Sequence, residues 1–152
     1  MPLTTSDRVH ALRAALEGRV LVADGAMGTM LQGIELDVEA DFAGLEGCNE
    51  ILSITRPDAV AQVHDAYLEA GSDLVLTNTF GANLAALTEY DVVDRLAEIS
   101  EASARIARER ADAHSTEDKP RWVLGSMGPG TKLPSLAQIG FAEIRDAYQR
   151  QV

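Results

Sequence analysis

Cysteine is almost absent from this sequence, with Cys48 alone among 152 residues. A single thiol cannot form an intrachain disulfide, and it cannot supply the several thiolates of a cysteine-rich metal site. We therefore expect no disulfide, and no metal bound by this chain alone. A free cysteine is most often a small buried hydrophobe, and we interpret Cys48 in that way.

Basic residues are scarce as well. The chain has 13 Lys and Arg against 24 Asp and Glu, which gives a formal net charge of -11. Its longest basic cluster, Arg105, Arg108 and Arg110, is interrupted by Glu109. Nucleic acid is bound by basic surfaces that displace counterions, so we expect no nucleic-acid partner. The negative charge is typical of a protein that stays in solution.

Long apolar runs are missing too. No stretch of about 18 uncharged apolar residues occurs, so the sequence predicts no membrane span and no membrane partner. Residues 1–10 are polar and mixed in charge, unlike a secretory signal, which favours a cytoplasmic location. With 46% hydrophobic and 5% aromatic residues, the chain can still build a globular core, mostly from Ala, Leu and Val.

Hydrophobic periodicity predicts alternating strands and helices. A first helix over residues 6–16, capped by Ser6 or Asp7, comes before the strands. The predicted strands cover 20–23, 73–77 and 122–124, and further helices cover 55–70, 84–89, 92–113 and a last stretch through Phe141, Ile144 and Tyr148. The unbroken apolar run at 20–23 is typical of a strand covered on both faces. Thr55 opens a capping-box pattern before Pro57.

The order of these elements indicates an α/β fold. Strands that alternate with helices require right-handed crossovers and a parallel sheet. In a parallel sheet the carboxyl ends of all strands lie at one edge, where ligand sites of barrels and open sheets are found. The long connection over residues 24–53 is unusual for a compact domain and indicates function or additional short elements.

Polar residues and glycines follow each predicted strand. Asp24 offers a carboxylate for an ammonium group and Gly25 allows close approach to the backbone, although a helix-capping Asp is an equal alternative. Asn78 and Thr79 offer an amide and a hydroxyl to a small polar ligand, and the alternative is an Asx-turn that caps the next helix. Residues 125–130 form a glycine-rich turn that fits either ligand contact or a loop with positive φ.

Other chemistries find little support. The spacing of Gly25 and Gly28 does not match a dinucleotide fingerprint, and a phosphate-loop lysine is missing. His10, His64 and His114 have no partner at metal-ligand spacing, and we interpret all three as structural. No Ser-His-Asp or Cys-His arrangement can be assembled.

Several motifs occur together in a specific order. They are Ala-Asp-Gly-Ala-Met-Gly-Thr at 23–29, Cys-Asn-Glu at 48–50, Thr-Arg-Pro-Asp at 55–58, Ala-Gly-Ser-Asp at 70–73, Thr-Asn-Thr-Phe-Gly-Ala at 77–82 and Gly-Ser-Met-Gly-Pro at 125–129. In order and spacing this set resembles the homocysteine-binding module of cobalamin-dependent methionine synthases, in the homocysteine S-methyltransferase superfamily. The resemblance extends over nearly the whole chain.

The resemblance implies a (β/α)8 barrel that binds homocysteine at the carboxyl ends of its strands. It implies that zinc on three cysteines activates the homocysteine thiol, and that the methyl group comes from methylcobalamin, recharged by methyltetrahydrofolate on other modules. Asp24 would then meet the substrate ammonium and the Gly25 region its carboxylate. Asn78 and Thr79 would line the pocket.

The sequence also departs from the family pattern. A (β/α)8 barrel takes about 250 residues, whereas about three βα units are recognisable here. The family's zinc cysteines and a second carboxylate for the substrate amine, on strand four, are missing, and Cys48 lies outside the family's zinc motif. We therefore expect residues 1–152 to be a partial homocysteine-binding domain, incomplete at its C-terminus, which binds neither zinc nor cobalamin and does not turn over alone.

Two alternatives stay open. One is part of a cobalamin-independent homocysteine S-methyltransferase that takes its methyl group from S-methylmethionine or betaine. The other is a small, non-catalytic α/β binding module that is complete at this length. Unpaired sheet edges on the first and third strands are expected if the chain is part of a barrel.

Overall fold

The computed structural model describes residues 4–151. Its helices are α1 (Thr5–Gly18), α2 (Met27–Gln32), α3 (Leu52–Thr55), α4 (Pro57–Ala70), α5 (Leu84–Leu87), α6 (Leu96–Ala113) and α7 (Phe141–Gln149). Short 3-10 turns are η1 (Asn49–Ile51), η2 (Thr88–Tyr90), η3 (Val93–Arg95) and η4 (Pro134–Leu136), and the strands in this range are β1 (Leu74–Leu76) and β2 (Trp122–Leu124). The predicted helices over 84–89 and 92–113 are therefore each divided, into α5 with η2 and η3 with α6.

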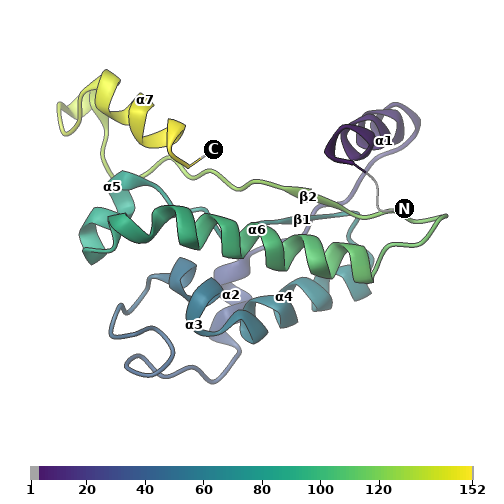
Figure 1. The fold of residues 1–152 in the computed structure, drawn as a ribbon, viewed down its shortest axis with the longest axis horizontal. Coiled ribbons are helices and arrows are strands. Elements are labelled where there is room, and N and C mark those ends of the chain that lie inside the picture. The colour runs from purple at the N-terminus through teal and green to yellow at the C-terminus, as the bar shows by residue number, and fades with distance from the viewer. Residues whose placement is uncertain (1–3, 152) are drawn as a thin grey trace.

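β1 lies at the centre of the sheet (Figure 1). It pairs in parallel with β2, so that Leu74 lies opposite Trp122 and Leu76 opposite Leu124. On the other side of β1, one parallel bridge joins Ala23 to Leu74. The predicted α/β arrangement with parallel strands is confirmed.

The predicted strand over residues 20–23 is wrong in its extent and burial. The Val22 carbonyl accepts hydrogen bonds from the amides of Asp73 and Leu74 at 2.7 and 3.1 Å, so the segment follows β1 without forming a regular ladder. Val20 is 85% exposed and Val22 57% exposed. A strand buried on both faces requires a neighbour on each, and the described residues cover neither of these side chains.

Asp73 fastens this segment to the sheet. Its carboxylate accepts two hydrogen bonds from the Arg19 guanidinium, at 2.9 and 2.8 Å, and a third from the Val22 amide at 2.9 Å. The Arg19 hydrogen bonds, with that of Val22, hold the pKa of this buried carboxyl down at about 2. The carboxylate is therefore ionised at neutral pH.

The predicted cap of the first helix is also wrong. Thr4 caps α1, because its hydroxyl accepts from the Asp7 amide at 3.2 Å while the Asp7 carboxylate accepts from the Thr4 amide at 3.1 Å. Ser6 lies inside the helix. The pattern of a capping box is present, but it begins two residues before the predicted cap.

The second predicted cap fails for a different reason. Thr55 is the last residue of α3, and its hydroxyl donates to the Ile51 carbonyl at 3.2 Å. α4 starts at Pro57 without a side-chain cap. The long connection thus leads into short helices, and Thr55 belongs to the last turn of one of them, α3, instead of capping α4. The predicted end of α4 at Gly71 is confirmed, with a φ of 112° that glycine adopts without strain.

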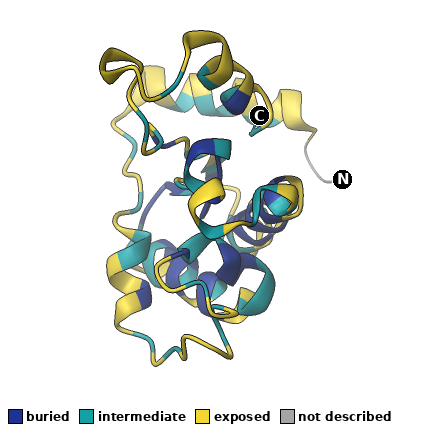
Figure 2. Cartoon of the chain, turned by 90° about the vertical axis from the view of Figure 1, so that its left-hand side faces the viewer, coloured by how far each residue is buried: buried dark blue, intermediate teal, exposed yellow. Residues whose placement is uncertain are grey.

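The core lies where α4 and α6 pack side by side against the strands (Figure 1). Val60 and Val63 of α4 share a buried cluster with Ile106 of α6, and Leu68 joins Val75 of β1 in another. Figure 2 shows the buried residues gathered in the middle of the molecule. The predicted 3.6-residue stripes therefore mark the faces that form the core.

His64 also lies in this core and is fully buried. Neither ring nitrogen has a hydrogen-bond partner among residues 4–151, and burial holds the pKa of His64 down at about 4. At neutral pH it is therefore an uncharged core residue.

α1 and α7 stand apart from this core at opposite ends of the molecule (Figure 1). None of the residues of α1 is buried, but Val9 and Leu12 line a groove together with Trp122, which is only 4% exposed. In α7 the predicted stripe is covered unevenly, since Phe141 is 76% exposed whereas Ile144 and Tyr148 are half-buried. Within residues 4–151, no helix combines the length and apolar character needed to cross a membrane.

Candidate functional site

A cavity of about 400 Å³ lies at the carboxyl end of the sheet. All three parallel segments reach it, Asp24 and Gly25 after the bridge, Leu76, Thr77 and Asn78 at the end of β1, and Ser126 after β2. The start of α2, with Ala26, Met27 and Gly28, together with Asn49, Glu50 and Phe80, completes the lining. The prediction that the three strand exits share one edge is confirmed.

Asp24 brings a carboxyl group with a raised pKa to the cavity. Both of its oxygens accept from the Leu76 amide, at 3.1 and 3.0 Å. Partial burial raises the pKa of Asp24 to about 6, although the hydrogen bond from Leu76 opposes the rise. The ion pairs among residues 4–151 do not include Asp24. A cation in the cavity would stabilise the ionised form of this carboxyl group.

The alternative interpretation of Asp24 as a helix cap is wrong. α2 starts after Ala26 and has no side-chain cap. The alternative for Asn78 fails too, because Asn83 caps α5 by accepting from the Ala86 amide at 3.0 Å. Asp24 and Asn78 both follow strands, but neither side chain caps the next helix.

A tyrosine side chain approaches Gly25 closely. A Cβ atom at Gly25 would lie 2.9 Å from the hydroxyl oxygen of Tyr67 on α4. Gly28 is a milder case, since its Cβ would lie 3.2 Å from the side-chain nitrogen of Asn49. Larger residues here would therefore require the Tyr67 or Asn49 side chain to shift.

Asn78 is 5% exposed and is held from behind the cavity. Its side-chain nitrogen donates to the Asn49 carbonyl at 2.8 Å and to the Ser53 hydroxyl at 3.2 Å. Ser53 and Ser103 share a hydrogen bond of 2.6 Å, and the Ser103 hydroxyl donates to the Asn78 carbonyl at 3.0 Å. The side-chain amide is thus tied to η1 and α3, and the main-chain carbonyl of Asn78 is tied to the long helix α6.

Thr79 is placed differently from the other predicted site residues. Its hydroxyl lies 2.6 Å from that of Thr77 and donates to the Ser126 carbonyl at 2.8 Å, while the Ser126 amide donates to Thr77 at 2.9 Å. Thr79 does not line the cavity. The structure therefore brings Asp24, Gly25 and Asn78 together and uses Thr79 to join the exits of β1 and β2.

Glu50 is a cavity residue that the sequence did not single out as a site residue. Its carboxylate accepts from the Gly81 amide at 2.7 Å, and a Cβ atom at Gly81 would stand 2.7 Å from the same oxygen. The available signals were the Cys-Asn-Glu motif and the glycine after Phe80. Neither reveals that the two segments meet.

The residues present do not fit a zinc site. Cys48 is fully buried, and burial raises the pKa of its thiol, whereas a metal ligand is a thiolate. Among residues 4–151, no three His, Cys, Asp or Glu side chains gather closely enough to hold a metal ion. No zinc chemistry can therefore be assigned to these side chains.

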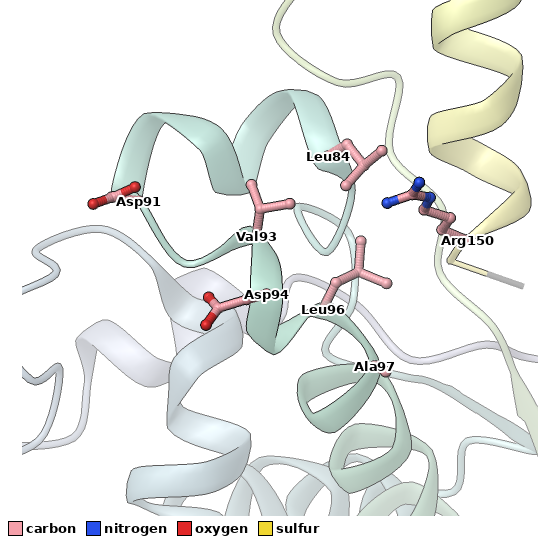
Figure 3. A pocket seen from close by; sticks show the side chains of 7 residues that line it. All are labelled: Leu84, Asp91, Val93, Asp94, Leu96, Ala97 and Arg150. Carbon is pink, nitrogen blue, oxygen red and sulfur yellow. The ribbon is translucent and has the colours of Figure 1, made fainter.

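A second, larger cavity of about 830 Å³ lies between η3, the start of α6 and the end of α7. Figure 3 shows Arg150 pointing toward Leu84, whereas Asp91 and Asp94 point away from it. The polar groups of this second cavity therefore do not converge on a common point. The cavity at the strand ends, with its converging polar groups, is the better candidate for a functional site.

Comparisons with known proteins give relatives of this sequence. Methionine synthase of Mycobacterium tuberculosis is 56% identical over 133 residues, which are 88% of this chain and 11% of that protein. Methionine synthase of Mycobacterium leprae is 55% identical over 137 residues, or 90% of this chain and 11% of that protein. The chain thus spans about a tenth of the length of the curated relatives it matches.

Solved structures support the fold. The metallated form of the homocysteine methyltransferase MmuM from Escherichia coli aligns with a TM-score of 0.62 at 23% identity, over 78% of this chain and 41% of that one. Its oxidized form gives 0.63 at 23% identity, over 77% and 40%. The fold is therefore that of part of a TIM barrel. Because the family model for homocysteine S-methyltransferase matches residues 21–152, this chain belongs to that methyltransferase family.

Proposed function

We propose that this chain binds the amino-acid end of homocysteine in a methionine synthase. The observation that carries the proposal is the half-buried Asp24 carboxylate, which lines the cavity at the strand ends and has a pKa raised to about 6. Asp24 takes the substrate ammonium and the Gly25 backbone takes its carboxylate. Asn78 lines the same cavity, and Thr79 acts from behind by fixing the exits of the strands.

The chemistry follows from the charges. An ammonium beside Asp24 stabilises the ionised carboxylate and makes a charge-assisted hydrogen bond. With the amino acid held at this end, the thiol extends into the part of the site that residues 4–151 do not build. In the reaction a bond forms between sulfur and the methyl carbon, the bond from methyl to its donor breaks, and the thiol proton is released.

We infer that the methyl donor is methylcobalamin, recharged by methyltetrahydrofolate, on modules outside this chain. The support is the identity of 56% and 55% to proteins named methionine synthase. Zinc would activate the thiol in the complete site, with ligands from elsewhere. A donor assay separates this inference from its rival, since turnover with S-methylmethionine or betaine in place of methylcobalamin would contradict it.

We further infer that residues 1–152 form part of a homocysteine-binding domain. The support is a sheet of three parallel segments and an alignment that covers 41% of a solved relative. Catalysis by these residues alone is not expected, because the groups for the thiol end are outside them.

Replacement of Asp24 by asparagine tests the proposal in the full-length gene product. Asp24→Asn removes the charge but keeps the shape, and we expect the KM for homocysteine to rise by about tenfold to a hundredfold, because a charge-assisted bond is lost. Asp118→Asn, at an exposed position in the link before β2, is the matched control. Unchanged kinetics in Asp24→Asn would refute the role of Asp24.

A further inference from the structure

Three buried groups behind the cavity form a closed ring of hydrogen bonds. The ring runs from the Asn78 side chain to Ser53 at 3.2 Å, from Ser53 to Ser103 at 2.6 Å, and from Ser103 to the Asn78 carbonyl at 3.0 Å. Ser53 is 2% exposed and Ser103 is fully buried. The ring begins and ends on one residue of the cavity, and its hydroxyls come from α3 and α6.

The direction of the ring is fixed by counting hydrogens. Each serine hydroxyl has one hydrogen to donate. That of Ser103 goes to the Asn78 carbonyl, so Ser103 can only accept from Ser53. Ser53 has then used its own hydrogen, and it can only accept from the Asn78 amide. All donors and acceptors of the ring therefore point the same way around.

The orientation of the Asn78 amide follows from this direction. Its second hydrogen goes to the Asn49 carbonyl at 2.8 Å, an atom that can only accept. An amide turned by 180° would place its oxygen against this carbonyl and leave the ring without a donor. Both hydrogens of the amide are thus used inside the protein, and the oxygen Oδ1 is what Asn78 has left for the cavity.

We propose that Ser53 and Ser103 are positioning residues that hold Asn78 with Oδ1 available to the cavity, so that the site selects a ligand with a hydrogen-bond donor at this point. The inference rests on the proposed function, in which that donor is the homocysteine ammonium. The neighbouring groups agree with this polarity, because Asp24 and Glu50 also present carboxylate oxygens to the same cavity. A neutral or anionic group in place of the ammonium would meet only acceptors from these three side chains.

The test compares two ligands that differ only in the donor. L-homocysteine carries the ammonium, and 4-sulfanylbutanoate is the same molecule without it. Calorimetric titration of the full-length gene product and of its Ser103→Ala variant gives both dissociation constants. We expect Ser103→Ala to raise the dissociation constant of homocysteine by about tenfold and that of 4-sulfanylbutanoate by less than about twofold. The reason is that only homocysteine has a donor for the oriented Oδ1 of Asn78.

Ser100→Ala is the matched control. It removes another hydroxyl from the same helix, one that is buried without a hydrogen-bond partner among the described residues. Its selectivity between the two ligands should stay at the wild-type value. Ser53→Ala breaks the same ring and should reproduce Ser103→Ala, and the double variant should lose no more selectivity than either single variant.

The outcomes separate this inference from the proposed function. Equal weakening of both ligands, or no weakening, in folded Ser103→Ala and Ser53→Ala would overturn the positioning role. A wild-type protein that binds homocysteine no better than 4-sulfanylbutanoate would instead overturn the proposed function. If both alanine variants fail to fold, Ser103→Thr replaces them, because threonine keeps the hydroxyl. The inference then requires Ser103→Thr to keep the wild-type selectivity for homocysteine. A folded Ser103→Thr variant that has lost this selectivity would overturn the inference.

Discussion

Asp24 shows how far a single residue can be understood from its position in the sequence. A carboxylate directly after an apolar run was predicted to lie at a strand end, and it does. Its hydrogen bond to Leu76, which comes from a strand 52 residues later, was not predictable, and it excludes the capping alternative. Glu50 was missed for the same reason, because its contact with Gly81 joins segments 31 residues apart.

If Asp24 holds the homocysteine ammonium as proposed, its raised pKa predicts that homocysteine binding depends on pH. Below a pH of about 6 the free carboxyl is protonated, and a bound ammonium must displace that proton. Homocysteine affinity should therefore rise as pH increases through about 6 and level off above it. Calorimetry in two buffers of different ionisation enthalpy should detect proton release near this pH. Asp24→Asn should abolish the part of the release that grows as the pH falls through about 6. A release that still grows over this range in the variant would contradict the assignment to Asp24.

Among the elements, the long helices with a periodic apolar pattern and the strands β1 and β2 were predictable. α4 and α6 carry apolar residues at helical spacing, and this spacing alone marks the face that is buried. The run at 20–23 indicates a strand but cannot tell whether neighbours cover it. The short helices α2 and α3 were not predicted, because six and four residues are too few to show a periodic pattern.

The segment before the sheet depends on Asp73. Asp73→Asn should lower the free energy of unfolding by about 1–3 kcal/mol, because the Arg19 guanidinium loses its bidentate carboxylate and one of the two acceptor oxygens becomes an amide donor that faces Arg19 or the Val22 amide. Asp73 has a lowered pKa, so the stability it contributes is present above about pH 4 and is lost as the pH falls toward 2. Urea unfolding at pH 7 measures the difference.

A surface ion pair provides the comparison for that measurement. Asp58 pairs with Arg56 at 2.8 Å, but its side chain is 66% exposed. Asp58→Asn should therefore change the free energy of unfolding by less than about 1 kcal/mol. If both substitutions changed the free energy of unfolding equally, the hydrogen bonds of Asp73 would contribute no more to stability than an exposed ion pair.

At the scale of the whole molecule, the alternation of elements predicted a parallel sheet, but the barrel was predicted only from the resemblance. Three parallel segments are compatible with an open sheet or with part of a closed one. The described sheet has β1 in the middle, with β2 and residues 20–23 on its two sides. Exposed apolar residues, Val22 on one side and Leu124 on the other, lie along these outer segments.

The zinc content of the purified chain tests whether these residues hold a metal site without the rest of the domain. The purified 152-residue chain should contain well under one zinc per molecule by mass spectrometry of the metal, because residues 4–151 bring no three potential ligands together. Addition of a chelator should leave its unfolding transition unchanged. One zinc per chain that a chelator removes would show that the chain holds a metal site of its own.

Trp122 gives the molecule a built-in optical reporter. It is the single tryptophan of the chain, it lies in β2 almost fully buried, and it shares a groove with α1. Because an indole emits at longer wavelength in water, a red shift of its fluorescence signals that α1 has moved away or that β2 has separated from the sheet. Trp122 does not line the cavity at the strand ends. Its emission therefore reports on the packing of α1 and β2 and not on direct contact with a ligand in the cavity.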